Sequence, residues 1–343
     1  LAQESSITQK ADALLTAAVA EGHTVGIAAG ISKNGITKWT GQAGKSHLNK
    51  SASFTSSTVN RIASITKPMT AVAIMQLREQ GKLKLEDKIG QYLPAFTKGD
   101  KNSITIRHVL HHTSGLRAYA NNKERNNKIH YPTLADALKI FVDDELLFPP
   151  GTDFAYTSYG YVVLGLVIEK ASGLSYGEYL QQHIWVPAGM TQTSIEIAGQ
   201  PYPNKAGIYH LSKPGKIKEP PPTDISDRLP GGGVQSTVTD LLKFSNALLD
   251  GTLVNREQLR LMSVDCGLKQ QGSGYGFGWY LYGDNPTMGE LIGHTGAQLG
   301  ASAFLMIAPE QNTSVVVLTN TSGALQRVSD ITVQLINSAD QFD

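Results

Sequence analysis

The chain has 343 residues, of which 41% are hydrophobic and 17% are charged, and its formal net charge is +1. This composition is typical of a globular protein that has enough residues for a large core, in one large domain or two. The near-zero charge and the absence of basic blocks argue against nucleic acid as the main partner, and no apolar run is long enough for a membrane span.

The first section of the chain, residues 1–62, is expected to contain one helix and one strand pair. Apolar residues recur at helical spacing over 7–20. Two extended runs follow at 24–32 and 36–40, and Asn34-Gly35 lies between them. Because Asn-Gly favours the tight turn of a β-hairpin, we expect these runs to pair as antiparallel strands.

The middle of the chain, residues 63–235, is expected to be mostly helical with long loops. Six prolines and scattered charges between 201 and 229 indicate an extended surface loop. Helices are expected in this section and just beyond it at 65–80, 105–112, 133–145, 158–172, 176–184 and 237–249.

The last section returns to strands, which we expect at 275–282, 303–308 and 314–319, before a closing helix at 325–338. Strands at both chain ends with helices between them predict an α/β (α+β) fold. In this fold, a central antiparallel sheet is built from both ends and flanked by helices. Two domains are expected: a sheet domain of residues 1–62 and 236–343, and a mainly helical domain of 63–235. The active site is expected between them.

The most informative motif is Ser64-Ile-Thr-Lys67 at the start of an expected helix. Residues three apart share a helix face, so the amine of Lys67 can reach the hydroxyl of Ser64. A serine hydroxyl is a poor nucleophile until a nearby base takes its proton. The free amides at a helix start also favour negative charge that develops near the serine.

Two further motifs can complete such a site. A tyrosine at 156 that lies between Ser64 and Lys67 can act as a base or pass a proton to a leaving group. In His294-Thr295-Gly296, a Thr-Gly pair at a strand edge lets a substrate backbone approach closely. The next amide, that of Ala297, can then join the amide of Ser64 in an oxyanion hole.

The three motifs, in this order, resemble those of the serine penicillin-recognising superfamily, which contains the serine β-lactamases and penicillin-binding proteins. The similarity is greatest to the branch of class C β-lactamases, D,D-carboxypeptidases (peptidase S12-like) and family VIII esterases, which includes the mitochondrial serine β-lactamase-like proteins. It covers about residues 20–320. Further segments that match this branch are His111–Leu116, Phe148–Gly151, Tyr159–Gly165, Gly231–Thr237 and Gly293–Ala301.

The resemblance implies a class C β-lactamase-like fold and an acyl-enzyme at Ser64, with Lys67 and Tyr156 as its proton-transfer partners and no cofactor or metal. It places Ser158, Thr295 and Gly296 at the substrate, beside the catalytic His294. Efficient β-lactamases of the branch usually carry Asn where this chain has Ser158, and Lys where it has His294. Strong β-lactamase activity is therefore not expected.

Three other patterns have simpler structural interpretations. Gly173-Leu-Ser-Tyr-Gly177 fits a nucleophile elbow, but Ser175 and Glu178 form a capping-box pattern. His108, His111 and His112 can share a helix face, yet no further ligand is spaced to complete a metal site. Three glycines at 231–233 are not followed by the Lys-Ser/Thr of a phosphate loop, and they are expected to let a loop pass close to the site.

The aromatic residues near the last motif are expected to pack on the sheet, although Tyr280 can also line the substrate site. Some D,D-carboxypeptidases hold a terminal carboxylate with a basic residue on this strand, and none stands between Tyr275 and Tyr282.

The sequence thus predicts a serine hydrolase that cleaves amide bonds of small peptides or D-amino-acid-containing substrates. A family VIII-type carboxylesterase and a non-catalytic binding or scaffold protein stay open as alternatives. The expected partner is a small molecule or peptide, without nucleic acid, and the oligomeric state is left open. The chain begins at Leu1 with no initiator methionine and no signal-peptide pattern. The resemblance to bacterial members of the branch favours an exported protein, periplasmic or secreted, from which a signal peptide has been removed.

Overall fold

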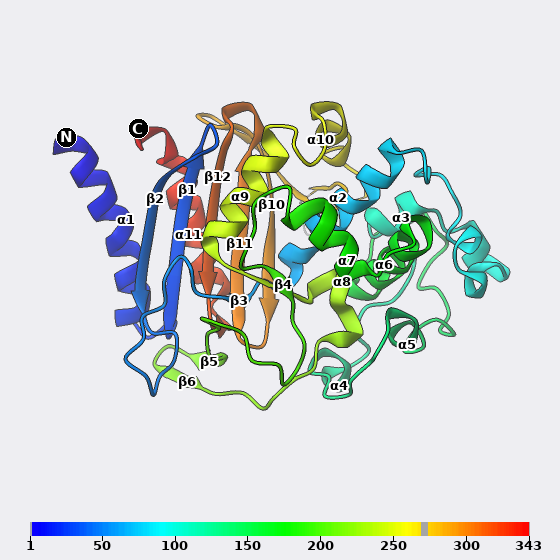
Figure 1. Ribbon diagram of the computed structural model, residues 1–343, viewed down its shortest axis with the longest axis horizontal. Helices are drawn as coiled ribbons and strands as arrows, with labels where there is room; N and C mark the ends of the chain where they lie inside the picture. Colours follow the sequence, from blue (N-terminus) through cyan, green and yellow to red (C-terminus); the bar gives the residue numbers. More distant parts are fainter. Residues whose placement is uncertain (1, 269–273, 343) are drawn as a thin grey trace.

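The computed structural model describes residues 2–268 and 274–342, and its centre is a seven-stranded sheet in the order β2-β1-β12-β11-β10-β9-β8 (Figure 1). Neighbouring strands pair antiparallel throughout, and strands from the two chain ends meet where Ala29 of β1 opposes Val317 of β12. The predicted sheet built from both chain ends is confirmed. Its strands are β1 (Gly26–Lys33), β2 (Ile36–Gly44), β8 (Gly274–Tyr275), β9 (Tyr280–Asn285), β10 (Gly289–Gln298), β11 (Ala301–Ala308) and β12 (Thr313–Thr319).

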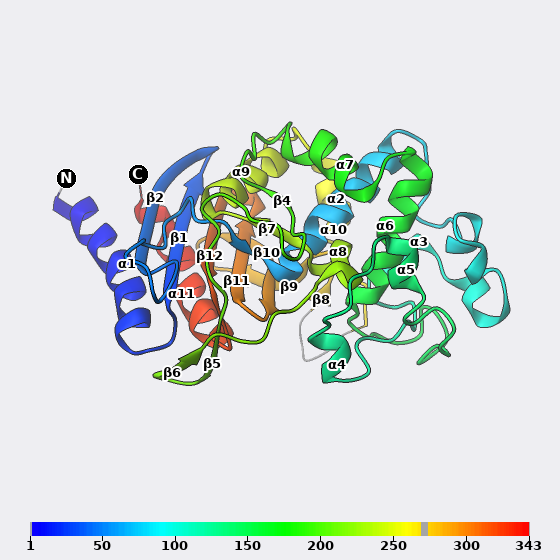
Figure 2. The same ribbon diagram turned by 60° about the horizontal axis from the view of Figure 1, so that its bottom comes forward.

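Helices cover both faces of this sheet, as the two views in Figures 1 and 2 show. Helices α1 (Ala2–Ala20) and α11 (Leu325–Asn337) pack on one face, and α9 (Val238–Leu249) packs on the other. Side chains of a strand alternate between faces, so Ile27 belongs to the core under α1 and α11, whereas Ala28 belongs to the core on the α9 side. Coverage on both faces explains why the central strands are apolar almost throughout.

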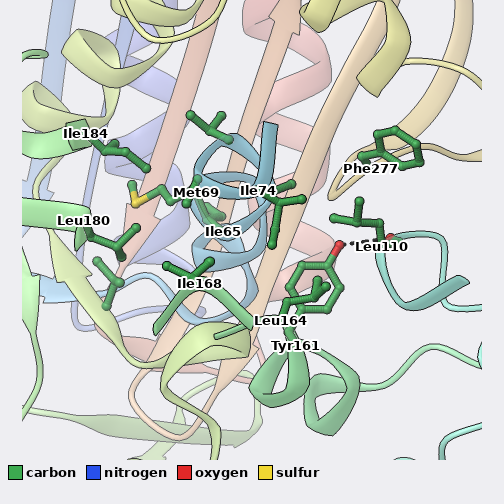
Figure 3. Packing of buried hydrophobic residues seen from close by; sticks show 14 of the residues in the cluster. Ile65, Met69, Ile74, Leu110, Tyr161, Leu164, Ile168, Leu180, Ile184 and Phe277 are labelled. Carbon is green, nitrogen blue, oxygen red and sulfur yellow. Dashed lines mark hydrogen bonds between the residues drawn. The ribbon is translucent and has the colours of Figure 1, made fainter. Parts of the chain in front are cut away.

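The helical part of the molecule lies beside the sheet and is centred on α2 (Thr66–Glu79) and α6 (Ser158–Ser172). Figure 3 shows side chains of these helices packed together, and the hydroxyl of Tyr161 donates to the carbonyl of Leu110 at 3.0 Å. The remaining helices are α3 (Ile106–Leu110), α4 (Asn122–Arg125), α5 (Leu134–Leu138), α7 (Tyr176–Leu180), α8 (Leu229–Gly232) and α10 (Arg256–Met262).

Several local predictions are confirmed by the backbone. Helix α6 has the predicted bounds and ends at Gly173, whose φ of 77° is the left-handed conformation that a glycine adopts without a side-chain clash. Ser175 caps α7 in a capping box with Glu178, so the Gly-x-Ser-x-Gly pattern is a helix start. The predicted hairpin turn at Asn34 and Gly35 is confirmed, and these residues have positive φ values of 53° and 77°.

Four predicted elements differ from the structure. The region 201–229 contains a small hairpin, β5 (Tyr209–Lys213) with β6 (Lys216–Lys218), and β5 pairs with β13 (Thr321–Ser322). The predicted strand at 275–282 is interrupted between β8 and β9, where Gly278 has a φ of 78°. The His294 motif was expected at a strand edge, and it lies within β10, which was not among the predicted strands.

The fourth is the helix expected at 133–145, which ends as α5 at Leu138. Here the guanidinium of Arg117 donates to the carbonyl of Ile140 at 3.0 Å and pairs with Asp144 at 2.5 Å. In a longer helix, a backbone N–H one turn further along would donate to this carbonyl oxygen. Here the side chain of Arg117 donates to it instead.

The proposed boundaries of two domains, at residues 62/63 and 235/236, stay a prediction. In the described ranges, no helix combines the length and the apolar character needed to cross a membrane.

Candidate active site

Ser64 lies in a tight turn that links a short strand to helix α2. Strand β3 (Asn60–Arg61) pairs with β7 (Val234–Ser236), and the chain then turns through the 3₁₀ segment Ala63–Ile65. Ala63 has a φ of 48°, which costs an L-residue about 1–2 kcal/mol. The hydroxyl of Thr66 stabilises this turn by donating a hydrogen bond to the carbonyl oxygen of Ala63 at 2.7 Å. As a result, Ser64 projects half-exposed from an otherwise buried turn.

The side chain of Lys67 is fully buried beneath Ser64 and reaches three oxygen atoms. Its Nζ lies 3.1 Å from Ser64 Oγ, 3.0 Å from Ser158 Oγ and 2.8 Å from the carbonyl oxygen of Gly231. Burial, assisted by the positive charge of Arg228, lowers the pKa of Lys67 well below its ordinary value of 10.5. No carboxylate contacts this amine in the part of the chain that the structure describes, so little offsets the cost of a buried charge.

Tyr156 lies beside the same pair. The Nζ of Lys67 is 4.6 Å from the centre of the Tyr156 ring, and Tyr280 stacks on that ring at a centroid distance of 6.1 Å. Burial raises the pKa of Tyr156 well above 10, and the neighbouring Tyr280 raises it further, while a hydrogen bond with Ser64 acts in the opposite direction. Tyr156 therefore holds its proton at rest.

The three-glycine segment brings a backbone carbonyl to Lys67. A Cβ at Gly231 would lie 2.8 Å from the carbonyl oxygen of Ser158, so any larger residue would push this segment away from α6. Ser158 itself is fixed as the first residue of α6, because the side chain of Thr157 caps this helix. The predicted close pass of the glycines is confirmed by these distances.

His294 is enclosed within the protein, at 1% exposure, and both of its ring nitrogens have partners. Nδ1 lies 2.7 Å from the carbonyl oxygen of Thr295, which can only accept, so Nδ1 carries the proton. Nε2 then accepts from the hydroxyl of Tyr275 at 3.1 Å. Burial, together with the nearby Lys67, lowers the pKa of His294 to about 3, so the imidazole is neutral at physiological pH.

Strand β10 runs directly against the turn that carries Ser64. A Cβ at Gly296 would lie 2.3 Å from the carbonyl oxygen of Ile62, so glycine is required for this approach. Ala297 follows on the exposed side, next to Ser64 in the same cavity. Within residues 2–268 and 274–342, β9 pairs with β10 only as far as Gly293, which leaves the edge beyond it open.

A cavity of about 360 Å³ opens at Ser64. Of the predicted site residues, Ser64, Tyr156, Ser158 and Ala297 line it, and Lys67 lies behind them. His294, Thr295, Gly296 and Tyr280 are not among its lining residues; Tyr280 stacks on Tyr156 instead. The lining residues that sequence reasoning missed are Tyr119, Arg125, Asn126, His210, Arg228, Gln298, Leu299 and Ser322.

The missed residues come from segments far apart in the chain, and no local motif marks them. Tyr119, Arg125 and Asn126 lie around α4, His210 lies on β5, and Arg228 lies in the stretch that was expected to be a loop.

The three histidines at 108, 111 and 112, for which a structural role was expected, have separate partners. His108 Nδ1 accepts from the amide of Thr105 at 3.2 Å, and the ring of His111 packs 4.5 Å from that of Phe277. His112 Nδ1 accepts from the amide of Thr157 at 3.1 Å, and its ring lies 4.4 Å from the ring of Tyr156. His112 thus contacts both Tyr156 and Thr157.

Known proteins resemble this chain along most of its length. The Beta-lactamase family model matches residues 11–337. A penicillin-binding protein of Bacillus subtilis is 30% identical over 76% of this chain, and the mitochondrial serine beta-lactamase-like protein of Homo sapiens is 27% identical over 83%. The chain spans 60% of the first relative's length and 69% of the second's.

A solved structure, that of a D-stereospecific amidohydrolase from Streptomyces sp., is also similar to this one. The two have a TM-score of 0.79 and 26% sequence identity over 94% of this chain and 98% of that one.

Proposed function

The chain belongs to the Beta-lactamase family of serine hydrolases, and we propose that it cleaves amide bonds of small peptides or D-amino-acid-containing substrates through an acyl-enzyme at Ser64. The observation that carries this proposal is the position of Lys67, which is buried within 3.1 Å of the Ser64 hydroxyl and has a strongly lowered pKa. A neutral amine in this position is a base that can remove the proton of Ser64.

Acylation begins when the proton of Ser64 moves to Nζ of Lys67 and Ser64 Oγ attacks the substrate carbonyl carbon. A neutral lysine donates two hydrogens and accepts one. The carbonyl oxygen of Gly231 and the hydroxyl oxygen of Ser158 accept the two hydrogen bonds that the amine donates. The lone pair of Lys67 Nζ is then free to accept the proton of Ser64. This arrangement supports Lys67 as the base.

The negative charge that forms on the substrate oxygen is stabilised by the backbone amides of Ser64 and Ala297. The proton then passes from Lys67 through the hydroxyl of Tyr156 to the leaving amine, as the C–N bond breaks. The raised pKa of Tyr156 supports a relay by a protonated tyrosine over a resting phenolate. Water, deprotonated by the same groups, releases the acid from Ser64.

Weak or absent β-lactamase activity is part of the proposal. A β-lactam carries a carboxylate, which a positive side chain at position 294 would attract. The pKa of His294, about 3, leaves this residue neutral, and its two nitrogens are already bonded to Tyr275 and Thr295. We assign His294 a positioning role at β10.

The amide preference is supported by the similarity to the D-stereospecific amidohydrolase. A carboxylesterase using the same residues is the second candidate. Measured kcat/KM values for D-amino-acid amides and for 4-nitrophenyl acyl esters separate the two, with Ser64→Ala as the control in each assay. Turnover of the amides supports the proposal, and turnover of esters alone supports the esterase.

A non-catalytic scaffold predicts no turnover of either substrate class. The assembled contacts of Ser64, Lys67 and Tyr156 argue against it. Export of the protein stays a prediction.

A further inference from the structure

We propose that Arg125 binds a carboxylate on the acyl part of the substrate, so that the enzyme prefers acidic acyl groups. This inference rests on the proposed acyl-enzyme at Ser64. Arg125 is exposed and lines the same cavity as Ser64, together with Asn126 and Gln298. Arginine and amide groups are donors that match a carboxylate.

The charges around this cavity leave Arg125 uncompensated. No aspartate or glutamate stands among the cavity's lining residues. The acidic residues near α4 already have cationic partners: Glu124 pairs with Arg117 at 2.8 Å, and Asp227 pairs with Arg228 at 2.7 Å.

Asp224, farther along the chain, lies 2.9 Å from His130. Among residues 2–268 and 274–342, Arg125 makes no ion pair. An anionic group of the substrate could therefore form an ion pair with the guanidinium of Arg125.

The backbone that carries Arg125 is fixed, although its side chain reaches solvent. The guanidinium of Arg228, at 4% exposure, donates to the carbonyls of Glu124 and Arg125 at 2.8 and 2.9 Å. At the other end of α4, the side chain of Asn121 accepts from the amides of Lys123 and Glu124. A cation on such a tethered turn loses less entropy on binding than one on a free loop.

The position of Tyr280 outside the cavity lining supports placing the carboxylate on the acyl part. Tyr156, which passes the proton to the leaving group, has Tyr280 stacked on its ring, and Tyr280 does not line the cavity. The lining does include Tyr119 and Arg125 together with Ser64. If the leaving group lies beside Tyr156 and Tyr280, the acyl group occupies the part of the cavity lined by Tyr119 and Arg125.

The test compares two 4-nitrophenyl esters, the monoesters of adipic and suberic acid, each with its neutral methyl ester. Two acyl chain lengths are used because the acyl group has to extend from Ser64 to Arg125. For the better of the two lengths, we expect kcat/KM of the acid to exceed that of its methyl ester about fivefold to tenfold at low ionic strength. This preference is expected to fall at 1 M salt, where the screening length is about 3 Å.

The variant Arg125→Gln is expected to lower the ratio of kcat/KM on the acid to kcat/KM on its methyl ester to about one. The matched control is Lys123→Gln, which removes a charge from the same helix outside the cavity lining and is expected to keep the preference. Equal rates on acid and methyl ester in the unmodified protein, or an unchanged preference in Arg125→Gln, overturn the assignment. Failure to cleave any of the four esters would instead count against the acyl-enzyme itself.

Discussion

The amine of Lys67 lies 3.1 Å from the hydroxyl oxygen of Ser64, at the bottom of the turn that exposes this serine. The amine is buried, and its other two contacts are the neutral oxygens of Ser158 and Gly231. A charged ammonium in such surroundings loses hydration that neutral oxygens replace only in part. The site therefore favours the neutral amine, which is the form that can accept a proton.

Replacing Lys67 by a permanently charged residue should abolish this base. We expect Lys67→Arg to lower kcat/KM on the cleaved substrate about 10²- to 10⁴-fold, the usual contribution of a general base. Lys67→Met, which keeps an apolar chain of similar length, should show the same loss and a melting temperature no lower than that of the unmodified protein. Activity within a factor of ten in Lys67→Met would exclude Lys67 as the base.

The pH dependence of acylation reports the lowered pKa of Lys67. Below that pKa the amine is protonated and cannot accept the Ser64 proton, so the acylation rate should rise with pH and reach a plateau. Because burial lowers the pKa well below 10.5, the rise should be complete well before pH 10. Stopped-flow acylation from pH 5 to 10 measures this, and a rate still rising at pH 10 would contradict a neutral resting lysine.

Gly296 sets how closely β10 approaches the nucleophile turn. In Gly296→Ala the new Cβ would lie 2.3 Å from the carbonyl of Ile62, so the strand must move away from Ser64 and take the amide of Ala297 with it. A misplaced oxyanion donor costs about 10²- to 10³-fold in kcat. As a control, Gly177→Ala in α7 places its Cβ at an ordinary 3.4 Å from Ile195 and should leave kcat unchanged.

If Gly296→Ala retained full kcat, the oxyanion role of Ala297 would be wrong. A crystal structure of that variant would show whether β10 has moved.

Acid should unfold the protein partly through its buried histidines. His294 has a folded pKa of about 3 and His111 one of about 4, both below the ordinary value of 6.5. At pH values above 6.5 neither state binds the proton. As the pH falls below 6.5, the unfolded chain gains protons that the folded chain refuses, so stability decreases, by up to about 1.4 kcal/mol per pH unit for each histidine.

Urea unfolding at pH 7, 6 and 5 measures this loss. His294→Asn keeps a donor for the carbonyl of Thr295 and should reduce the loss between pH 6 and 5 by about 1 kcal/mol. Equal losses in the two proteins would mean that His294 is protonated in the folded state.

The sheet and the nucleophile turn were predictable because their signals are local. Asn34-Gly35 dictates a hairpin through its backbone preferences, and Ser64 with Lys67 occupies one helix face through spacing alone. The end of α6 followed from Gly173, whereas the cap Thr157 at its start was recognised only in the structure. Each of these depends on neighbours within a few residues.

The parts that the sequence could not supply depend on contacts between distant segments. Arg228 reaches the carbonyl of Arg125 across 103 positions, and no pattern around either residue records this contact. The strand β10 was missed because its glycines have low strand propensity, and one of them, Gly296, is needed there for the approach to the Ser64 turn. The neutral state of His294 likewise arises from burial by the whole fold.

The most direct test of Ser64 as the acylated residue is intact-protein mass spectrometry after incubation with a fluorophosphonate and, separately, with penicillin G. We expect one fluorophosphonate adduct, located at Ser64 by peptide mapping, absent in Ser64→Ala and strongly slowed in Lys67→Met. We expect the penicillin adduct to form slowly or not at all, because the neutral His294 does not attract the carboxylate of the β-lactam. An adduct at another residue, or undiminished labelling of Ser64→Ala, would contradict the account.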